Sequence, residues 1–431
     1  MSEQTASTNK RKLPLHVKIL IGLLAGAAIG TTTNLITHGG TNVQGFVSFV
    51  TEPIGRMWLS GLIMVVIPLI VSTLSLGVAS LGSLKRLGRI GMITILSFLL
   101  LTTLSTILGL TAMNVLQPGA GLDPEVRTRL MEAYKGQAQG AMGLSEGKFG
   151  IDLFVKIIPR NPLQAAANGD MLAVIFFSLM IGVALTALSP ERAVPMMKFL
   201  DSLGNVTVAI IELVMKVAPI GVFCLIFSVT ARFGFDLLVN LFQYVVTVIV
   251  CLFIFQTVGY SLVLKLFSRW KPGEFFRKIR LVMITAFSTS SSNATLPTTM
   301  RVAQEEMGIP REIAGFVLPL GATMNMNGTS LFEGATVLFL AQVFGVHLSL
   351  GVQLIVVLMA VITAIGTAGV PGGSIPLLMM VLGMVGVPIE GIAIILGVDR
   401  ILDMSRTVLN VSGDIVTATI VQRFDKSRNS L

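Results

Sequence analysis

Long apolar stretches separated by short polar segments dominate the first two thirds of the chain. Six of them reach about the 20 residues that an α-helix needs to cross the hydrocarbon core of a bilayer. They lie near residues 15–37, 53–83, 88–114, 151–188, 203–230 and 236–266. The pattern predicts an all-α integral membrane protein, with a polar insertion over 117–150 that we expect to be a solvated extracellular loop.

From residue 275 onward, clusters of small and polar residues interrupt the apolar segments. One cluster runs from Ser288 to Pro297 and the other from Gly366 to Pro376. Because glycine and proline break helical hydrogen bonding, neither cluster can continue a regular lipid-facing helix. Each segment is also too short for two full spans, which predicts two re-entrant helical hairpins with tips at membrane depth. An apolar helix carrying polar residues follows each hairpin, so this half of the chain contains an internal repeat typical of transporter binding sites.

The last apolar segment carries a dense group of charged and polar side chains. Four of them recur at i, i+4, i+7 and i+11 and therefore share one helix face. They are Asp399, Asp403, Arg406 and Asn410. A second, overlapping stripe contains Asp403, Thr407, Asn410 and Asp414. Unpaired charge in hydrocarbon costs several kcal/mol. A structural salt-bridge network would explain the pattern, but the neighbouring hairpins favour a polar site at membrane depth.

Composition and charge agree with a membrane protein. Of 431 residues, 53% are hydrophobic and 12% charged, whereas soluble domains average about 25% charged. A net charge of +9 is compatible with nucleic-acid binding, but the basic residues lie in short loops such as 10–12, 85–89 and 265–280, as the positive-inside rule describes. We therefore expect no nucleic-acid partner, and a multi-pass protein of a bacterial inner membrane with both termini in the cytoplasm.

Catalytic and metal-binding motifs are missing from the sequence. Cys224 and Cys251 lie singly in apolar stretches, and the three histidines show no metal-ligand spacing. The chain has no HExxH motif, no nucleotide-binding loop and no nucleophile–base–orienter set. We expect that the protein is not an enzyme.

Four motifs together point to a known family. They are the serine-rich tip at 288–297, Asn-Met-x-Gly-Thr at 325–329, Gly-Thr-Ala-Gly-Val-Pro-Gly at 366–372 and Leu-Asp-Met-x-Arg-Thr-x-x-Asn-x-x-Gly-Asp at 402–414. In this order they resemble a prokaryotic member of the dicarboxylate/amino acid:cation symporters, the glutamate transporter family. The resemblance covers nearly the whole chain. It implies eight transmembrane helices plus two re-entrant hairpins, inverted repeats, and a homotrimer whose protomers each move substrate by an elevator motion.

The resemblance also implies a division into two domains. A scaffold would comprise 1–83, with helices 1 and 2, and 115–235, with helices 4 and 5 and the extracellular insertion. A moving transport domain would comprise 84–114, with helix 3, and 236–423, with helix 6, the first hairpin, helix 7, the second hairpin and helix 8. Residues 424–431 would form a cytoplasmic tail.

A substrate site follows from the same resemblance. Arg406 would pair with the substrate's side-chain carboxylate, because a planar guanidinium offers two parallel hydrogen bonds. Asp403 would take the α-amino group, with Thr407 assisting. The groups implied for the α-carboxylate are Asn410, Ser291 and Ser292. The other pocket residues implied are Met326 and Thr329, and in the second hairpin, the expected extracellular gate, Val370, Gly372 and Ser374.

Two sodium sites are implied as well. The first would use side chains and carbonyls of Gly321, Asn325, Asn410 and Asp414. The second would use Thr323 with backbone near Ala364, Ile365 and Thr367. Shells rich in oxygen suit a hard cation such as sodium, and unwound backbone supplies the carbonyls.

The chain departs from the family pattern at one further cation site. Most relatives carry Asp at the position of Asn327, where it contributes to a third sodium site. Phe98 and Leu101 stand where two more oxygen ligands are usual, although Thr102 keeps a hydroxyl. We therefore predict coupling to two sodium ions.

Proton coupling is a separate hypothesis. Glu333 occupies the position of the proton carrier of eukaryotic relatives, and burial disfavours the charged form of a carboxyl group. The alternative is that Glu333 is structural and pairs with a polar neighbour. Arg400, next to Asp399, has no role that the sequence assigns.

The favoured function is a secondary active symporter that imports aspartate or glutamate. A C4-dicarboxylate carrier is an alternative, although such members usually lack the carboxylate at the position of Asp403. A neutral amino-acid carrier is another, although such members usually lack the guanidinium of Arg406. A channel would not require carboxylates and guanidiniums paired on one helix.

Overall fold

A computed structural model describes residues 15–37, 40–81, 89–121, 158–168, 171–233, 236–367 and 369–425. Most of the predicted insertion, from 122 to 150, lies outside these residues, as do the tail over 426–431 and the basic residues at 10–12 and 85–86. Every element within the described residues is helical, which confirms the all-α class. Five helices among them are long and apolar enough to cross a membrane: Val17–Thr37, Thr41–Ala79, Arg89–Leu116, Pro190–Lys216 and Leu238–Phe267.

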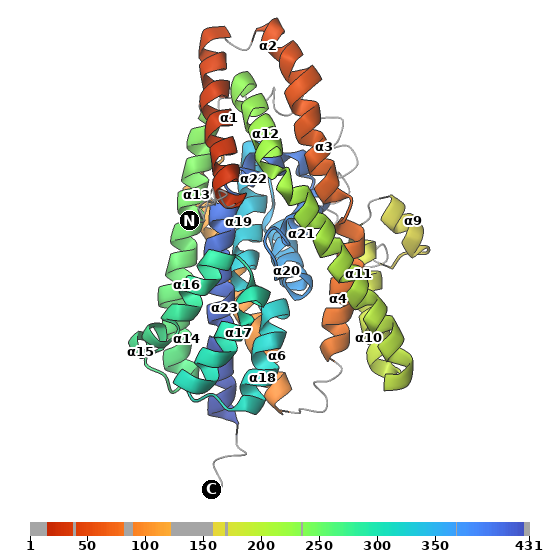
Figure 1. Cartoon of the computed structure of the whole chain (residues 1–431), viewed down its shortest axis with the longest axis vertical. Helices are drawn as coiled ribbons and strands as arrows, with labels where there is room; N and C mark the ends of the chain where they lie inside the picture. The colour runs from red at the N-terminus through yellow and green to blue at the C-terminus, as the bar shows by residue number, and fades with distance from the viewer. Residues whose placement is uncertain are drawn as a thin grey trace, which may run out of the picture.

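The helices pack in two groups; in Figure 1 most of the first group lies at the top and right, and most of the second at the left and bottom. The first group contains α1 (Leu15–Thr37), α2 (Thr41–Phe46), η1 (Val47–Thr51), α3 (Glu52–Ile63), α4 (Val66–Leu81), α9 (Pro162–Ala167), α10 (Met171–Ala187), α11 (Pro190–Lys216) and α12 (Ala218–Phe233). Helix α1 lies along α12, and α4 packs on α10 and α11. Glycine makes the first of these contacts possible, since a Cβ atom on Gly26 would lie 2.8 Å from the carbonyl oxygen of Phe223.

The predicted span over 203–230 is divided in the structure. Helix α11 ends at Lys216 and α12 begins at Ala218, so one apolar stretch contributes to two helices. Pro219 explains the break, because a proline lacks the N–H group that would continue the helical hydrogen bonds.

The second group contains the C-terminal half of the chain together with α6. Its elements are α6 (Arg89–Leu116), α13 (Asp236–Ile254), η2 (Phe255–Gly259), α14 (Tyr260–Phe267), α15 (Pro272–Lys278), α16 (Arg280–Thr289), α17 (Ser292–Arg301), η3 (Val302–Glu306), α18 (Arg311–Met324), α19 (Asn327–Val343), α20 (Leu350–Gly366), α21 (Ile375–Met384), η4 (Ile389–Gly391), α22 (Ile392–Leu396) and α23 (Asp399–Phe424). Helix α23 contacts α16, α18 and α19, and α19 also packs on α6. Helix α23 is therefore the central element of this group.

Both predicted interruptions are turns between two helices. In the first helix pair, α16 and α17, the chain turns at Ser290, whose φ of 51° is in the left-handed region. In the second helix pair, α20 and α21, the connection contains Gly372 with φ of 75°, a conformation that favours glycine. The two connections touch: the Ser291 hydroxyl donates to the carbonyl oxygen of Gly369 at 2.6 Å. A third interruption separates α18 from α19 at Asn325 and Met326, whose backbone is not helical.

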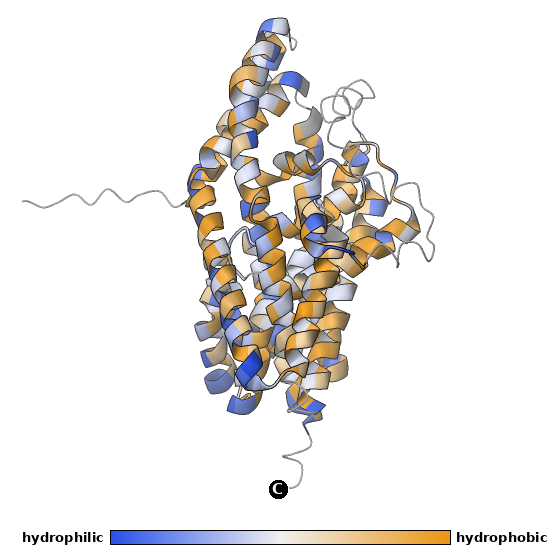
Figure 2. Ribbon diagram, turned by 90° about the vertical axis from the view of Figure 1, so that its right-hand side faces the viewer, coloured by the Kyte–Doolittle hydropathy of each residue, from blue (hydrophilic) through white to orange (hydrophobic). Residues whose placement is uncertain are grey.

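Large apolar side chains are exposed along the outer faces of the helices. Leu24, Phe253 and Leu354 are all more than half exposed. Figure 2 shows apolar residues over the length of the long helices, with hydrophilic residues at their lower ends and also near the top of the molecule. Contiguous apolar surface of this extent is unfavourable in water and suits a bilayer.

Candidate functional site

The two turns, the break between α18 and α19, and the first half of α23 surround one small cavity. Its lining contains eight residues of the predicted substrate site: Ser292, Met326, Thr329, Val370, Ser374, Asp403, Thr407 and Asn410. Ser290, Thr367 and Gly369 complete it. The cavity measures about 10 Å³, about the space of one water centre. A cavity of this size does not hold an organic molecule.

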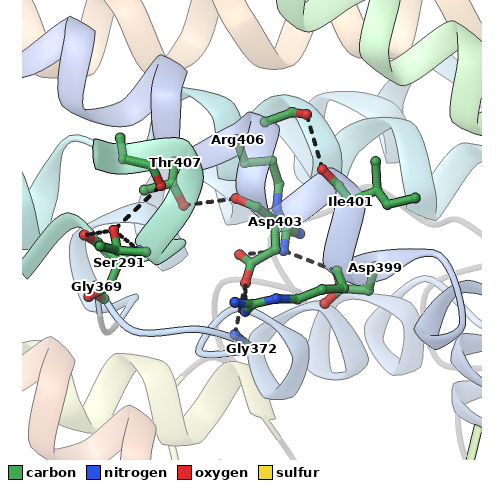
Figure 3. A network of polar contacts seen from close by, with 12 residues as sticks. Ser291, Gly369, Gly372, Asp399, Ile401, Asp403, Arg406 and Thr407 are labelled. Atoms are coloured by element: carbon green, nitrogen blue, oxygen red, sulfur yellow. Dashed lines mark hydrogen bonds and ion pairs between the residues drawn. The ribbon is translucent and has the colours of Figure 1, made fainter. Parts of the chain in front are cut away.

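Arg406 is the most heavily buried charge of the site, with 1% of its surface exposed. Its Nη2 donates to Asp399 Oδ1 at 3.0 Å and to Asp403 Oδ1 at 2.9 Å, as Figure 3 shows. The guanidinium also stacks on the ring of Phe332, with 3.8 Å between its carbon and the ring centre. Nε and Nη1 have no acceptor among the described residues. Both donors could bind a carboxylate, but they lie on different sides of the guanidinium, and Arg406 is not among the residues that line the cavity.

Asp403 connects Arg406 to the second helix pair. Its Oδ2 accepts the backbone N–H of Gly372 at 3.2 Å and lies 3.6 Å from Nη1 of Arg400. The Thr407 hydroxyl donates to the backbone carbonyl of Asp403 at 2.8 Å, so its lone pairs remain available to a donor. A cationic amine between Asp403 and Thr407 would find acceptors on both sides.

Asn410 stabilises the start of α19. Its Oδ1 accepts the N–H of Gly328 at 2.7 Å and that of Thr329 at 3.3 Å, and its Nδ2 donates to the Thr329 hydroxyl. These are orphan donors at a helix N-terminus, so the side chain acts as a cap supplied by another helix. The predicted contacts of Asn410 with substrate and sodium remain predictions.

Three of the four residues of the first predicted sodium site lie together: Gly321, Asn325 and Asp414. Asp414 is 2% exposed, and its Oδ1 accepts Nδ2 of Asn325 at 2.8 Å. A Cβ atom on Gly321 would collide with the same carboxylate, so backbone and Asp414 are in close contact. Asn325 Oδ1 is buried without a hydrogen-bond donor among the described residues. A carboxylate, an amide oxygen and nearby carbonyls fit a hard cation. No cluster of three His, Cys, Asp or Glu side chains occurs in the described part of the chain.

The second predicted sodium site is less enclosed. Thr323 is exposed and its hydroxyl donates to the carbonyl of Leu320 in its own helix. Thr367 is buried and donates to the carbonyl of Thr363, and Ala364 is buried beside it. No hydrogen bond joins Thr323 to the other three residues in the structure as described, so this site remains a prediction.

Asn327 is held by a hydrogen-bond network that the sequence did not predict. Its Oδ1 accepts the Thr102 hydroxyl at 2.9 Å, and its Nδ2 donates to the Tyr260 hydroxyl at 2.9 Å. Tyr260 donates onward to the carbonyl of Leu409, and Ser105 donates to the Asn327 carbonyl. An amide donor therefore occupies the position at which the family resemblance implies a carboxylate. Thr102 stood out in the sequence for its hydroxyl, whereas nothing there pointed to Tyr260 or Ser105.

Glu333 lies in the same helix as Asn327 and is fully buried. Its Oε2 accepts the Thr363 hydroxyl at 2.7 Å, and its Oε1 has no donor among the described residues. The predicted pairing with a polar neighbour is thus present, and one oxygen is left without a donor. The guanidinium of Arg406 stacks on the adjacent residue, Phe332.

Comparison with known proteins defines the class to which this fold and site belong. The model of the sodium:dicarboxylate symporter family matches residues 15–424, and the chain belongs to that family. It is a membrane transport protein. The resemblance in the four motifs is therefore confirmed.

Relatives of known name match over nearly the full length. The proton/sodium-glutamate symport protein of Bacillus caldotenax is 36% identical over 425 residues, which cover 97% of this chain and 96% of the relative. The proton/glutamate-aspartate symporter of Escherichia coli (strain K12) is 35% identical over 417 residues, covering 96% and 93%. The C4-dicarboxylate transport protein of Bacillus subtilis (strain 168) is 34% identical over 386 residues, covering 88% and 89%.

Proposed function

We propose that this protein is a secondary active symporter that imports an acidic amino acid together with sodium ions and a proton. The observation that carries the proposal is Arg406, whose Nε and Nη1 are buried without an acceptor beside the paired carboxylates of Asp399 and Asp403. A substrate with a second carboxylate supplies the missing acceptor, and its ammonium supplies a donor for Asp403. Two relatives named as glutamate or glutamate-aspartate symporters support the substrate class.

The mechanism we propose is an elevator. The first group of helices would be the scaffold, and the second group the transport domain that carries the site across the membrane. The two helix pairs would be re-entrant hairpins within eight membrane-spanning helices, with the second pair as the extracellular gate. Close contacts of α23 with α16, α18 and α19 support a domain that moves as one body. We further propose a homotrimer in a bacterial inner membrane, with both termini in the cytoplasm.

Coupling follows from the ion sites. Sodium at Asp414 and Asn325 would bind one helical turn beyond Asn410, which caps α19 at the substrate cavity. Occupation of the site would therefore fix the break between α18 and α19 and favour the closed second helix pair. Sodium and substrate would then both bind more tightly to the closed conformation than to the open one. This difference in affinity is the free energy that couples their transport.

Competition for uptake tests the substrate class. Purified protein in proteoliposomes should take up labelled L-aspartate, and excess L-glutamate should block uptake while succinate and L-serine do not. Inhibition by succinate equal to that by glutamate would overturn the amino-acid assignment and favour a C4-dicarboxylate carrier, the function named for one relative. Inhibition by L-serine as strong as that by L-glutamate would mean that Arg406 does not bind the substrate's side chain.

Asn327→Asp is expected to raise the number of sodium ions carried per substrate by one. The change replaces an amide donor with a carboxylate among the hydroxyls of Thr102 and Tyr260, which creates an oxygen set for a further cation. Ion-to-substrate stoichiometry from reversal potentials in proteoliposomes measures the result. If the wild-type protein carries three sodium ions per substrate, the prediction that Asn327 removes a third sodium site is wrong.

Glu333→Gln is expected to abolish uptake driven by a proton gradient alone while uptake driven by sodium persists. Glutamine still accepts the Thr363 hydrogen bond but cannot carry a proton. Uptake under each gradient separately gives the measurement, with Glu312→Gln at an exposed position of α18 as the matched control. Unchanged proton-driven uptake in Glu333→Gln would assign Glu333 a structural role.

A further inference from the structure

Arg400 is a second cation beside Asp403. Its Nη1 lies 3.6 Å from Asp403 Oδ2, the oxygen that also accepts the N–H of Gly372 in the second helix pair. The Arg400 side chain is 19% exposed, and its Nε is buried with no acceptor among the described residues. One oxygen of Asp403 therefore contacts both Arg400 in α23 and the N–H of Gly372 in the connection between α20 and α21.

Arg400 also lies where the two groups of helices meet. It lines a cavity of about 10 Å³ together with Asp399, Asp403 and Gly372 on one side. The opposite wall comes from the first group and is apolar: Ile19, Trp58, Met215, Ala218 and Val222. Asp399 and Asp403 share the single guanidinium of Arg406, so without a further cation any motion past the first group carries an excess negative charge along this apolar wall, which is costly.

We infer that Arg400 takes the place of the substrate's ammonium group on Asp403 when the carrier returns without substrate. The inference rests on the symport function proposed above, because every symporter must return its empty site to complete a cycle. With Arg400 in place, two guanidiniums balance the carboxylates of Asp399 and Asp403. The N–H of Gly372, in the proposed gate, then donates to a carboxylate whose charge is balanced. The closed site can then cross the membrane without net charge from these four residues.

This role of Arg400 predicts how substrate affinity changes when Arg400 is replaced. Arg400 and a substrate ammonium are like charges that compete for Asp403, so removal of Arg400 leaves substrate binding unchanged or tighter. A residue that only maintained the fold would weaken binding and transport together. Arg400 is therefore a positioning residue for the gate, and it acts in only one half of the cycle.

Net uptake and exchange, measured side by side, test the inference. Proteoliposomes without internal substrate report net uptake of labelled L-aspartate, which requires empty return; vesicles preloaded with unlabelled L-aspartate report exchange, which does not. Arg400→Gln should lower net uptake at least about tenfold and leave exchange within about twofold of wild type. Arg400→Lys, which keeps the cation, should restore net uptake.

The outcomes separate the inference from the function on which it rests. Wild-type protein without uptake or exchange would defeat the proposed function itself. Active wild type with parallel loss of both activities in Arg400→Gln, or with loss of neither, would overturn the role of Arg400. Arg400→Met carries the same test if Arg400→Gln does not yield folded protein, since it keeps the side-chain bulk without the charge.

Discussion

Arg406→Lys is expected to lower uptake of an acidic amino acid at least about a hundredfold, because charge-assisted hydrogen bonds from the guanidinium to the substrate are lost. Lysine keeps the positive charge that Asp399 and Asp403 require, but a single ammonium cannot replace the separate Nε and Nη1 donors of a planar guanidinium. Radiolabelled aspartate uptake by purified protein of confirmed monodispersity gives the measurement.

Lysine is a better substitution here than alanine. Arg406→Ala removes the cation that pairs with two buried carboxylates, which lowers the free energy of unfolding by about 3–5 kcal/mol. A loss of uptake could then reflect misfolding and not a loss of substrate binding. Arg311→Lys, at an exposed position of α18, is the matched control and should transport normally. If Arg406→Lys transports like this control, Arg406 does not bind the substrate's side-chain carboxylate.

Asp414→Asn is expected to raise the sodium concentration needed for half-maximal aspartate uptake at least about tenfold. The buried carboxylate is the formal charge of the oxygen set at Asn325 and Gly321, and cation affinity depends on the charge of its ligands. Asparagine still accepts the hydrogen bond from Asn325, so the contact between α23 and the break after α18 is retained.

The control for this substitution is Asp201→Asn, which makes the same chemical change at an exposed position of α11. Sodium titrations of uptake for the two variants and wild type are compared directly. An unchanged sodium requirement in Asp414→Asn would mean that sodium binds elsewhere in the chain.

Helical periodicity predicted the core of the candidate site well. Residues spaced by three and four positions must share a helix face, and Arg406 does contact both Asp399 and Asp403. The serine-rich cluster at 288–297 and the glycine- and proline-rich cluster at 366–376 predicted breaks, and the chain turns within both, at Ser290 and Gly372. These features depend on local geometry, which a single sequence contains.

Contacts between distant segments were not predictable in the same way. Tyr260 and Ser105 reach Asn327 from α14 and α6, and Thr363 reaches Glu333 from α20. Such contacts depend on how helices pack and which rotamer each side chain adopts, and no spacing along the chain encodes them. The stacking of Arg406 on Phe332 and the place of Arg400 beside Gly372 belong to the same class.

Accumulation of labelled L-aspartate in proteoliposomes under an imposed inward sodium gradient tests the central claim most directly. The account predicts uptake above the equilibrium level that collapses when the sodium gradient is dissipated and is absent with choline in place of sodium. Uptake that only equilibrates across the membrane, or that proceeds equally well in choline, would contradict sodium-coupled symport by this protein.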